Sequence, residues 1–556
     1  RTLVEIGGKI YQLRFSPFQI TLLPRFYEEL RGEMEAQAPS GTVRMRKAAG
    51  MYYTPSYLAD YLTWEVMKPE LAAVQKMLNQ ALEEKDSLLF LRGLKRLKKL
   101  KILDPACGTG VFLLSAFSQY LNFYQTKLKP LIDKGFSQFY LEAAEIKTDP
   151  VSFLEQLFGV DLDVLALEIG KHALFIFLCS RLGLVPSFPL LTFINLKEGN
   201  SLFCPPLEGG QSPEKIFFNQ EDNLFIWEQE FPQLFKGGED ECLLILGNPP
   251  WGGDLSKWNE FIFRRYGKDC QAPFDSYKLF IRLSLELMKK GDRLGFLVPS
   301  TLLNQTGYRD IRKKLLEEGS FLTIVDLGEG VFAQVTAPCC LFVWQKGGIS
   351  REVKLVNLAK INNEEKRREF LADSEQYSVL INQERFFSFP NLTIAASFNS
   401  ELEDLFLHLD SRGYPLLGQV AETITRGIET GNNRVFLVQE DEIKESGLKG
   451  DYFLPCFGGE EILPYLVLTP KQYLVLIPEG EEVEEEILTW LKERDDYFIC
   501  QCKEGKLKNY IALKERYKVR KGIIPWYALN SPRLNVTSGS QLVLRQTSDR
   551  LIAAPN

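Results

Sequence analysis

Between residues 51 and 348, short apolar runs alternate with longer stretches of helical periodicity, and this alternation restricts the fold more than any other feature. Strands that are separated by helices form βαβ units, which build a parallel sheet. The last expected strand follows its neighbour after a short loop, so we expect it to pair antiparallel at an edge of the sheet. The expected strands are 101–104, 157–161, 191–194, 242–246, 293–298, 321–326 and 339–345.

Changes in character along the chain predict its domains, and 556 residues are enough for about three of them. Residues 1–50 are expected to form an N-terminal helical extension, and 51–348 the α/β domain. Residues 349–400 are charged and mixed, which is typical of a connector, and 360–368 has the pattern of a solvated helix. Over 401–556, short β-rich segments broken by glycine turns predict a second, α+β domain.

Composition argues against several classes of protein. No apolar run approaches the roughly 18 residues of a membrane span, so we expect no membrane partner. Only two histidines are present, His172 and His408, which disfavours a histidine-rich metal site and a Ser-His-Asp triad. The ten cysteines include no Cys-x-x-Cys pair, so we expect reduced thiols in a cytoplasmic protein, and no metal site.

The formal net charge of −7 gives no general attraction to nucleic acid, so local charge has to be considered. Residues 91–101 hold six Lys or Arg and no acid. Residues 503–521 hold eight basic residues against two acidic ones, interleaved with Tyr510 and Tyr517. Each run has two readings that the sequence leaves open: a surface that binds nucleic acid, or a solvated helix face.

The sequence Gly-Asn-Pro-Pro-Trp at 247–251 follows the apolar run 243–246, which places Asn248 just past a buried strand. The amide oxygen of Asn248 and a nearby backbone carbonyl can accept hydrogen bonds from a planar NH2 group, while Trp251 stacks on its ring system. An amine conjugated to a ring is a poor nucleophile, and two acceptors push it towards a tetrahedral shape that frees its lone pair. The motif therefore indicates chemistry on the exocyclic amine of a base.

A second motif is the glycine loop at 104–110, Asp-Pro-Ala-Cys-Gly-Thr-Gly, between an expected strand and a helix from about Val111. Its glycines allow a nucleotide-like ligand to approach the backbone at the carboxyl edge of the sheet. The loop departs from the dinucleotide fingerprint, because Leu113 occupies the third glycine position.

An acid at the tip of the second strand can accept hydrogen bonds from both ribose hydroxyls of such a ligand, and we choose Asp161. Asp163 could instead cap the helix that starts near Val164. Asp161 lies much further from Asp104 than the usual ~20 residues, so an inserted helical segment is expected over 121–155.

Together, these motifs resemble those of a known family. The loop at 104–110 closely resembles the S-adenosylmethionine loop of amino-methyltransferases. With Asn-Pro-Pro-Trp at 248–251, the chain resembles the N6-adenine DNA methyltransferases of restriction–modification systems. The motif order is that of their gamma class, and the resemblance is greatest to large type II and phage-defence enzymes. It covers nearly all of the chain and implies a Rossmann-like class I methyltransferase domain followed by a target recognition domain over 401–556.

The resemblance also assigns residues to the cofactor. Residues 51–55 resemble the motif that holds the methionine end; read alone, they place Thr54 as a helix N-cap with Pro at the first helical position. Related sequences often have Asp where Asn200 stands, accepting from the cofactor's adenine amine; a plain turn is the alternative. Phe280 resembles a residue of the adenine pocket. Without the resemblance, it would be interpreted as a residue of the hydrophobic core. The implied cofactor residues are Tyr53, Thr54, Pro55, Asp104, Ala106, Cys107, Gly108, Gly110, Asp161, Leu162, Asn200, Ser201 and Phe280.

For the target base, Phe332 in the segment 330–333 resembles a Phe that packs against the flipped adenine; an ordinary strand-entry aromatic is the alternative. Trp251, where the family more often has Tyr or Phe, would sandwich the base with Phe332. The implied catalytic residues are Asn248, Pro249, Pro250 and Trp251. Segments 425–432 and 525–527 resemble parts of the target recognition domain.

The resemblance thus implies methyl transfer from S-adenosylmethionine to N6 of an adenine flipped out of double-stranded DNA, in the cytoplasm of a prokaryote. Transfer would be direct, so neither a metal nor a cysteine nucleophile is expected, and Cys107 would only fill space. Defence-system subunits are possible partners. One alternative is an RNA or protein-glutamine methyltransferase with the same catalytic loop, although the residues after 400 favour DNA. Another is a DNA-locating subunit of a defence complex.

Overall fold

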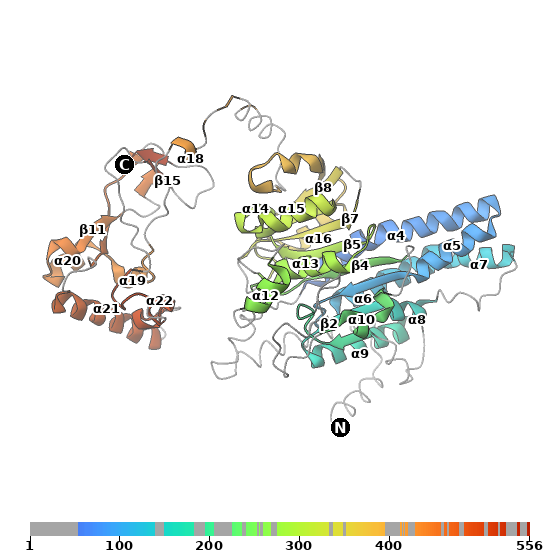
Figure 1. The fold of residues 1–556 in the computed structure, drawn as a ribbon, viewed down its shortest axis with the longest axis horizontal. Coiled ribbons are helices and arrows are strands. Elements are labelled where there is room, and N and C mark those ends of the chain that lie inside the picture. Colours follow the sequence, from blue (N-terminus) through green and yellow to red (C-terminus); the bar gives the residue numbers. More distant parts are fainter. Residues whose placement is uncertain are drawn as a thin grey trace, which may run out of the picture. The chain divides into compact units, whose positions relative to one another are not determined.

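The computed structural model forms two compact units, Arg1–Glu403 and Asp404–Asn556, and each is considered by itself (Figure 1). In the first unit the structure describes 54–139, 149–182, 195–204, 225–235, 241–252, 255, 259–267, 275–332, 337–348 and 352–394. In the second it describes 408, 412–413, 415, 417–420, 429–456, 461–463, 466–477, 483–504, 507, 510–520, 523–529, 542–544 and 553–555. Within these ranges, no helix has the length and apolar character needed to cross a membrane.

The first unit is built on one sheet with the strand order β3-β2-β1-β4-β5-β7-β6-β8-β9. Strands β1 to β5 run parallel, β7 is antiparallel to both of its neighbours, and β8 is parallel to β6. The predicted α/β class with a mainly parallel sheet is confirmed. The strands are β1 (Leu100–Asp104), β2 (Leu157–Asp161), β3 (Asn195–Glu198), β4 (Cys242–Gly247), β5 (Arg293–Pro299), β6 (Gly319–Gly328), β7 (Cys339–Lys346), β8 (Glu352–Asn357) and β9 (Ser378–Asn382).

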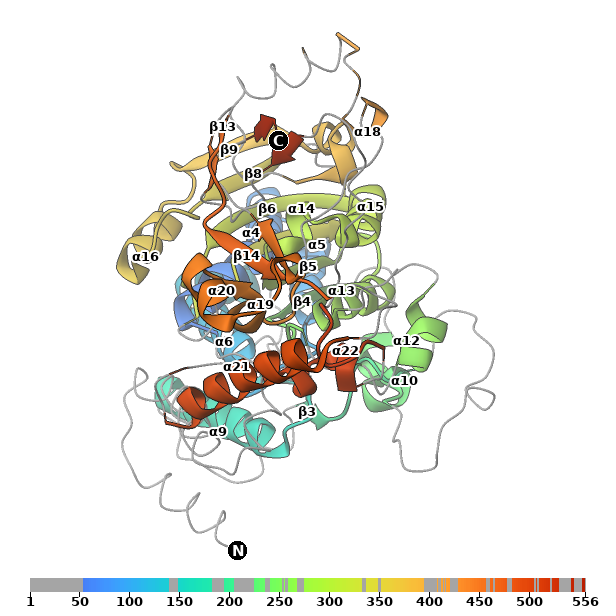
Figure 2. The same ribbon diagram turned by 90° about the vertical axis from the view of Figure 1, so that its left-hand side faces the viewer.

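Two expectations about this sheet are wrong. Strand β7 does pair antiparallel, but it lies between β5 and β6 instead of at an edge, and its residues from Cys339 to Trp344 are buried. The segment 349–400 is not merely a connector, because β8 and β9 extend the sheet beyond β6. In Figure 2 the sheet runs from β3 near the bottom of the unit to β8 and β9 near the top. The expected strand 191–194 lies outside the described residues, and β3 begins just after it.

Long helices flank the sheet and connect its strands. The segment expected as an insertion, 121–155, contains only the end of α6, which begins at the glycine loop, and all of α7, which follows it. The helix expected over 360–368 begins later and is only partly solvated, because Arg367 in it is 1% exposed. The helices include α4 (Ser56–Glu84), α5 (Ser87–Lys98), α6 (Val111–Phe123), α7 (Lys129–Phe139), α9 (Val164–Leu182), α12 (Asn259–Tyr266), α13 (Ser276–Leu287), α15 (Arg309–Glu318) and α16 (Glu364–Ala372).

The basic run 91–101 lies on α5 and the start of β1, and part of its charge is already paired. Arg96 donates to both carboxylate oxygens of Glu70, which is buried. Lys101 forms an ion pair of 2.7 Å with Glu241. These two cations therefore form ion pairs within the first unit. They belong neither to a surface that binds nucleic acid nor to a solvated helix face.

The second unit has a small antiparallel sheet of β10 (Leu437–Val438), β14 (Gln472–Val475) and β11 (Phe453–Cys456). Its longest described helix, α21 (Glu485–Lys503), contributes Ile487 and Leu491 to the core. These elements give the unit a hydrophobic core of its own, which is what an independent domain requires.

Two residues of the basic run 503–521, Arg516 and Tyr510, form hydrogen bonds with other residues of the second unit. Arg516 is 3% exposed and donates to the carbonyls of Thr430, at 3.0 Å, and Trp526, at 2.6 Å. The hydroxyl of Tyr510 donates to Asp495 at 2.5 Å. Arg516 therefore ties together the two loops that resemble parts of a recognition domain.

Candidate active site

The loop 248–251 leaves the end of β4, a strand that lies between β1 and β5 at the centre of the parallel part of the sheet. Glycine is required just before it, because a Cβ at Gly247 would lie 2.9 Å from Oδ1 of Asp104. Asp104 ends β1 and begins the glycine loop. The two predicted motifs are thus in contact at the carboxyl edge of the sheet, where ligands of open α/β sheets bind.

The side chain of Asn248 is oriented by Thr54. Its Nδ2 donates to Oγ1 of Thr54 over 3.0 Å, and its Oδ1 is buried. Because Nδ2 is held as the donor, the acceptor branch of the amide has a defined direction. Thr54 is not a helix N-cap: Pro55 occupies that position and α4 begins at Ser56. Tyr53 lies outside the described residues.

The start of α13 holds the other side of the same loop. Oγ of Ser276 donates to the carbonyl of Pro250 over 2.5 Å. The carboxylate of Asp275 accepts from N–H of Gly252 at 3.0 Å and from the hydroxyl of Tyr308 at 3.1 Å. We missed Asp275 and Ser276 in the sequence, where Asp-Ser before a helix is typical of a cap. Phe280 on the same helix is 6% exposed and belongs to the core cluster.

The structure brings Trp251 and Phe332 together, but not as two parallel walls. Their ring centroids are 5.1 Å apart and the planes are nearly perpendicular, at 87°. A base stacked between parallel rings needs about 7 Å between them, twice the ~3.5 Å contact distance of carbon atoms. The expected sandwich is therefore absent from this conformation, and at least one ring has to move before a base can enter.

The glycine loop is fixed by buried backbone contacts. Cys107 N–H donates to the carbonyl of Val160 in β2 at 2.9 Å, and its thiol is buried. Oδ1 of Asp104 accepts from Ala106 N–H at 3.1 Å. Burial raises the pKa of the Asp104 carboxyl to about 8, and the nearby charge of Asp161 also raises it.

Gly108 and Gly110 adopt left-handed φ angles of +52° and +75°, which favour glycine. No heavy atom lies within 4 Å of the position that a Cβ on Gly108 would take. A ligand can therefore approach this part of the loop, whereas a side chain at the same position would occupy the space.

Asp161 and Asp163 have separate tasks at the end of β2. The carboxylate of Asp161 accepts from N–H of Gly108 at 2.7 Å and of Asp163 at 2.9 Å. Asp163 caps α9 by accepting from N–H of Leu165 and Ala166, as the capping alternative predicted. Leu162 between them is 68% exposed, so it offers an apolar surface beside the glycine loop.

The loop after β3 also packs against the glycine loop. Oγ of Ser201 donates to the carbonyl of Pro105 over 2.6 Å, and Ser201 is buried. Oδ1 of Asn200 accepts from N–H of Leu202 at 3.2 Å, which is the turn geometry of the alternative reading. The predicted cofactor residues on the first three strands therefore lie along one edge of the sheet.

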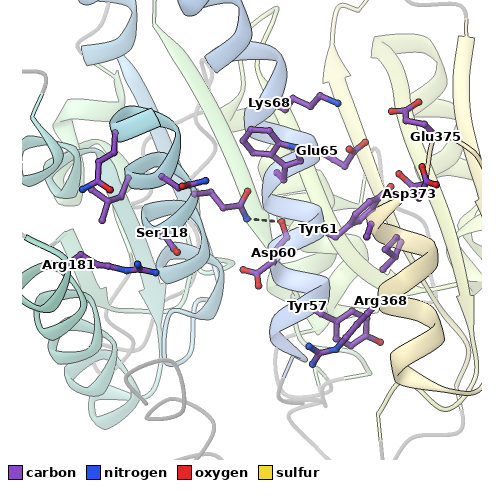
Figure 3. Close-up of a pocket in the computed structure, with 18 residues that line it drawn as sticks. Tyr57, Asp60, Tyr61, Glu65, Lys68, Ser118, Arg181, Arg368, Asp373 and Glu375 are labelled. Carbon is purple, nitrogen blue, oxygen red and sulfur yellow. Dashed lines mark hydrogen bonds between the residues drawn. The ribbon is translucent and has the colours of Figure 1, made fainter. Parts of the chain in front are cut away.

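A groove of about 710 Å³ lies elsewhere, on the outer side of α4, between α6 and α16. Figure 3 shows Tyr57, Asp60 and Arg368 among the residues around it. None of the residues that line it belongs to the predicted site. The mixed charges of its walls do not select one class of ligand.

This chain is similar in sequence to known restriction–modification enzymes. Residues 155–332 match the family described as Eco57I restriction-modification methylase. The type II restriction enzyme and methyltransferase RM.Eco57I of Escherichia coli is 26% identical over 262 residues, 44% of this chain and 24% of that protein. The adenine-specific methyltransferase PglX of Streptomyces coelicolor is 22% identical over 300 residues, 51% of this chain and 21% of that protein.

Among solved structures, the type IIL restriction-modification enzyme MmeI in complex with DNA has a similar fold, with a TM-score of 0.52 at 15% identity. The match covers 87% of this chain and 58% of that one. Against the first curated relatives, the matched part spans 24% to 57% of their length. Residues 155–332 of this chain are therefore similar to the Eco57I restriction-modification methylases.

Proposed function

We propose that this chain methylates the N6 amine of an adenine rotated out of double-stranded DNA, as part of a restriction–modification or phage-defence system. The observation that carries the proposal is the oriented amide of Asn248, held by Thr54 at the end of β4 and in contact with the glycine loop through Gly247. The names of the relatives, which are restriction–modification and adenine-specific methyltransferases, support the same reaction.

The acceptors for the amine are Oδ1 of Asn248 and the carbonyl of Pro249. The backbone after Pro249 is fixed at two points: Ser276 donates to the carbonyl of Pro250, and Asp275 accepts from the N–H of Gly252. Two acceptors in fixed positions draw on both hydrogens of the amine, so its lone pair becomes available without a proton being removed first. The expected contribution of these residues is alignment of the reacting groups.

The donor is S-adenosylmethionine, which when bound supplies a sulfonium-linked methyl group that an amine can take up. The residues fit this ligand: Gly108 leaves open space at the loop, and Leu162 exposes an apolar side chain next to it. A carboxylate offers about four acceptor positions. Asp161 can therefore bind ribose hydroxyls in addition to the two N–H groups that it already accepts. Thr54 and Pro55 would hold the methionine end, and Asn200 and Phe280 the adenine.

Bringing a base out of a duplex costs a few kcal/mol, and stacking it on an aromatic ring returns about 1–3 kcal/mol. Trp251 and Phe332 are the rings that would take it up, once their edge-to-face contact has opened. The second unit would select the DNA sequence. Its loops at Thr430 and Trp526, which Arg516 joins, support that role.

The test is transfer of tritium from methyl-labelled S-adenosylmethionine to unmethylated genomic DNA, followed by sequencing that detects N6-methyladenine. We expect label in DNA at one sequence context, and a loss of roughly 100-fold or more in Asn248→Ala, because both alignment and an acceptor are lost. Calorimetry should show that Asn248→Ala still binds the cofactor. Label in RNA or in protein glutamine would support the alternative substrates, and binding of DNA without any transfer would support a DNA-locating subunit.

A further inference from the structure

Helix α16 carries two adjacent arginines in opposite environments. Arg368 faces outward, with a side chain that is 52% exposed and an ion pair of 2.7 Å to Glu364. Its guanidinium also lies over the ring of Tyr57, as the labelled side chains in Figure 3 show. Arg367 is 1% exposed and is among the largest fully buried side chains. A buried guanidinium needs strong acceptors, because its charge has lost the solvation of water.

The acceptors of Arg367 are two consecutive carbonyls of the loop after β6. Nη2 donates to the carbonyl of Glu329 over 2.6 Å, and Nη1 donates to the carbonyl of Gly330 over 3.1 Å. One planar group therefore holds two adjacent peptide units. A lysine cannot reproduce this arrangement, since its single ammonium lacks the fork of parallel donors.

The loop that Arg367 holds needs an external contact. Gly328 and Gly330 have left-handed φ angles of +66° and +70°, so the chain turns sharply as it leaves β6. Two glycines so close together give this segment many alternative conformations when nothing fixes it. Phe332 follows two residues later, with its ring against Trp251. The position of this ring thus depends on the backbone that Arg367 binds.

Arg367 also lies next to the other side of the site. Burial raises the pKa of the Tyr57 hydroxyl, and the charge of Arg367, which is close by, opposes that rise. Tyr57 is in the first turn of α4, three residues after Thr54, the partner of Asn248. The guanidinium is thus located between the segment that orients Asn248 and the loop that carries Phe332.

We propose that Arg367 is a positioning residue, which holds the loop 328–332 so that Phe332 stays opposite Trp251 when the target base enters. The expected effect of Arg367 on methyl transfer rests on the proposed function. Its contact with the loop does not depend on that function. Arg367 touches neither the base nor the cofactor in this role. Its effect reaches the reaction only through the backbone of Glu329 and Gly330.

The experiment compares Arg367→Lys and Arg367→Gln with the matched control Arg368→Lys, all in the full chain. Hydrogen exchange read by mass spectrometry reports on the peptide 326–332 without any ligand. We expect protection there to fall about tenfold in both Arg367 variants, the equivalent of one lost charge-assisted hydrogen bond. It should not change in Arg368→Lys. Peptides from β1 and β5 should keep wild-type exchange, which shows that the sheet is intact.

Methyl transfer to unmethylated genomic DNA is measured on the same proteins. The turnover of the Arg367 variants should fall about tenfold while the dissociation constant for S-adenosylmethionine stays within about twofold of the wild type. Unchanged exchange in 326–332 overturns the proposal, and so does raised exchange with unchanged turnover. If the wild type transfers no methyl group, the proposed function fails, but the exchange comparison still decides whether Arg367 holds the loop. If neither Arg367 variant folds, hydrogen exchange of the wild-type protein tests the proposal. Unprotected amides at 328–332 would then show that the loop is not held.

Discussion

Asn248 and Thr54 are 194 positions apart in the sequence and are joined by one hydrogen bond of 3.0 Å, from Nδ2 to Oγ1. Thr54 is 4% exposed, so water does not replace it easily as the acceptor. The bond connects the segment that begins α4 with the loop that ends β4. It means that the direction of the Asn248 amide is set by a residue outside the motif Asn-Pro-Pro-Trp at 248–251.

Replacement of Thr54 by Val, which has nearly the same shape, leaves Nδ2 of Asn248 without this acceptor. A buried donor that loses its partner costs about 1–3 kcal/mol, so we expect the turnover for methyl transfer to fall about tenfold. Thr54→Ser should retain most of the activity, because it keeps the hydroxyl. Steady-state kinetics with labelled S-adenosylmethionine measure the difference.

The matched control for that change is Thr63→Val in α4, the helix that begins just after Thr54. Thr63 is fully buried, and its Oγ1 has no hydrogen-bond partner among the residues that the structure describes. Its replacement should leave turnover unchanged and unfolding by urea at least as difficult as in the wild type. Equal losses of turnover in the two Val variants would contradict the role assigned to Thr54.

Ser276→Ala removes the hydrogen bond to the carbonyl of Pro250 without a change in backbone or charge. The loop between Asn248 and Trp251 then gains freedom, and we expect turnover to fall about tenfold while the affinity for S-adenosylmethionine stays nearly constant. Ser284→Ala is the control, because its hydroxyl is also buried in α13 but donates to Phe280 within the helix. Loss of turnover in both variants alike would point to a general weakening of α13.

The parts of the site that the sequence predicted have local signals. Asn248 follows an apolar run and precedes two prolines, so its place at a strand end could be predicted. Asp163 precedes a helical pattern, and its capping was predicted correctly. The contact of Ser276 with Pro250 spans 26 positions and that of Arg367 with Gly330 spans 37. A side chain that binds a distant carbonyl leaves no periodic pattern, so neither contact could be found.

Charge explains the wrong prediction for 349–400. The many Lys, Arg and Glu residues of this segment predict a connector. Two of these cations are in fact buried, since Lys354 in β8 pairs with Glu65 at 2.6 Å and Arg367 binds two carbonyls. Their partners come from α4 and from the loop after β6. Only the tertiary structure supplies these partners, and without them the residues are typical of a solvated surface.

Gly247→Ala tests the contact between the two motifs. The added Cβ would lie 2.9 Å from Oδ1 of Asp104, and Asp104 is itself fixed by Ala106 N–H. Overpacking of this kind costs about 1–3 kcal/mol, so we expect a lower urea midpoint together with weaker binding of S-adenosylmethionine. Gly450→Ala is the control, because no atom lies within 4 Å of its added Cβ. A Gly247 variant with wild-type stability and cofactor affinity would show that the two loops are not tightly packed.

The buried carboxyl of Asp104 should make the stability of the protein depend on pH. Burial raises its pKa in the folded protein to about 8, from an unfolded value near 3.8. Between these values the folded state holds a proton that the unfolded state has lost, so the free energy of unfolding decreases as pH rises through this window. The slope from this one group is at most about 1.4 kcal/mol per pH unit. Asp104→Asn mimics the protonated form and should remove that share of the slope, so that urea unfolding at pH 5 and at pH 8 differs less in the variant than in the wild type. An equal difference in both proteins would mean that Asp104 is ionised in the folded state at neutral pH, and that the loop contacts tolerate its charge.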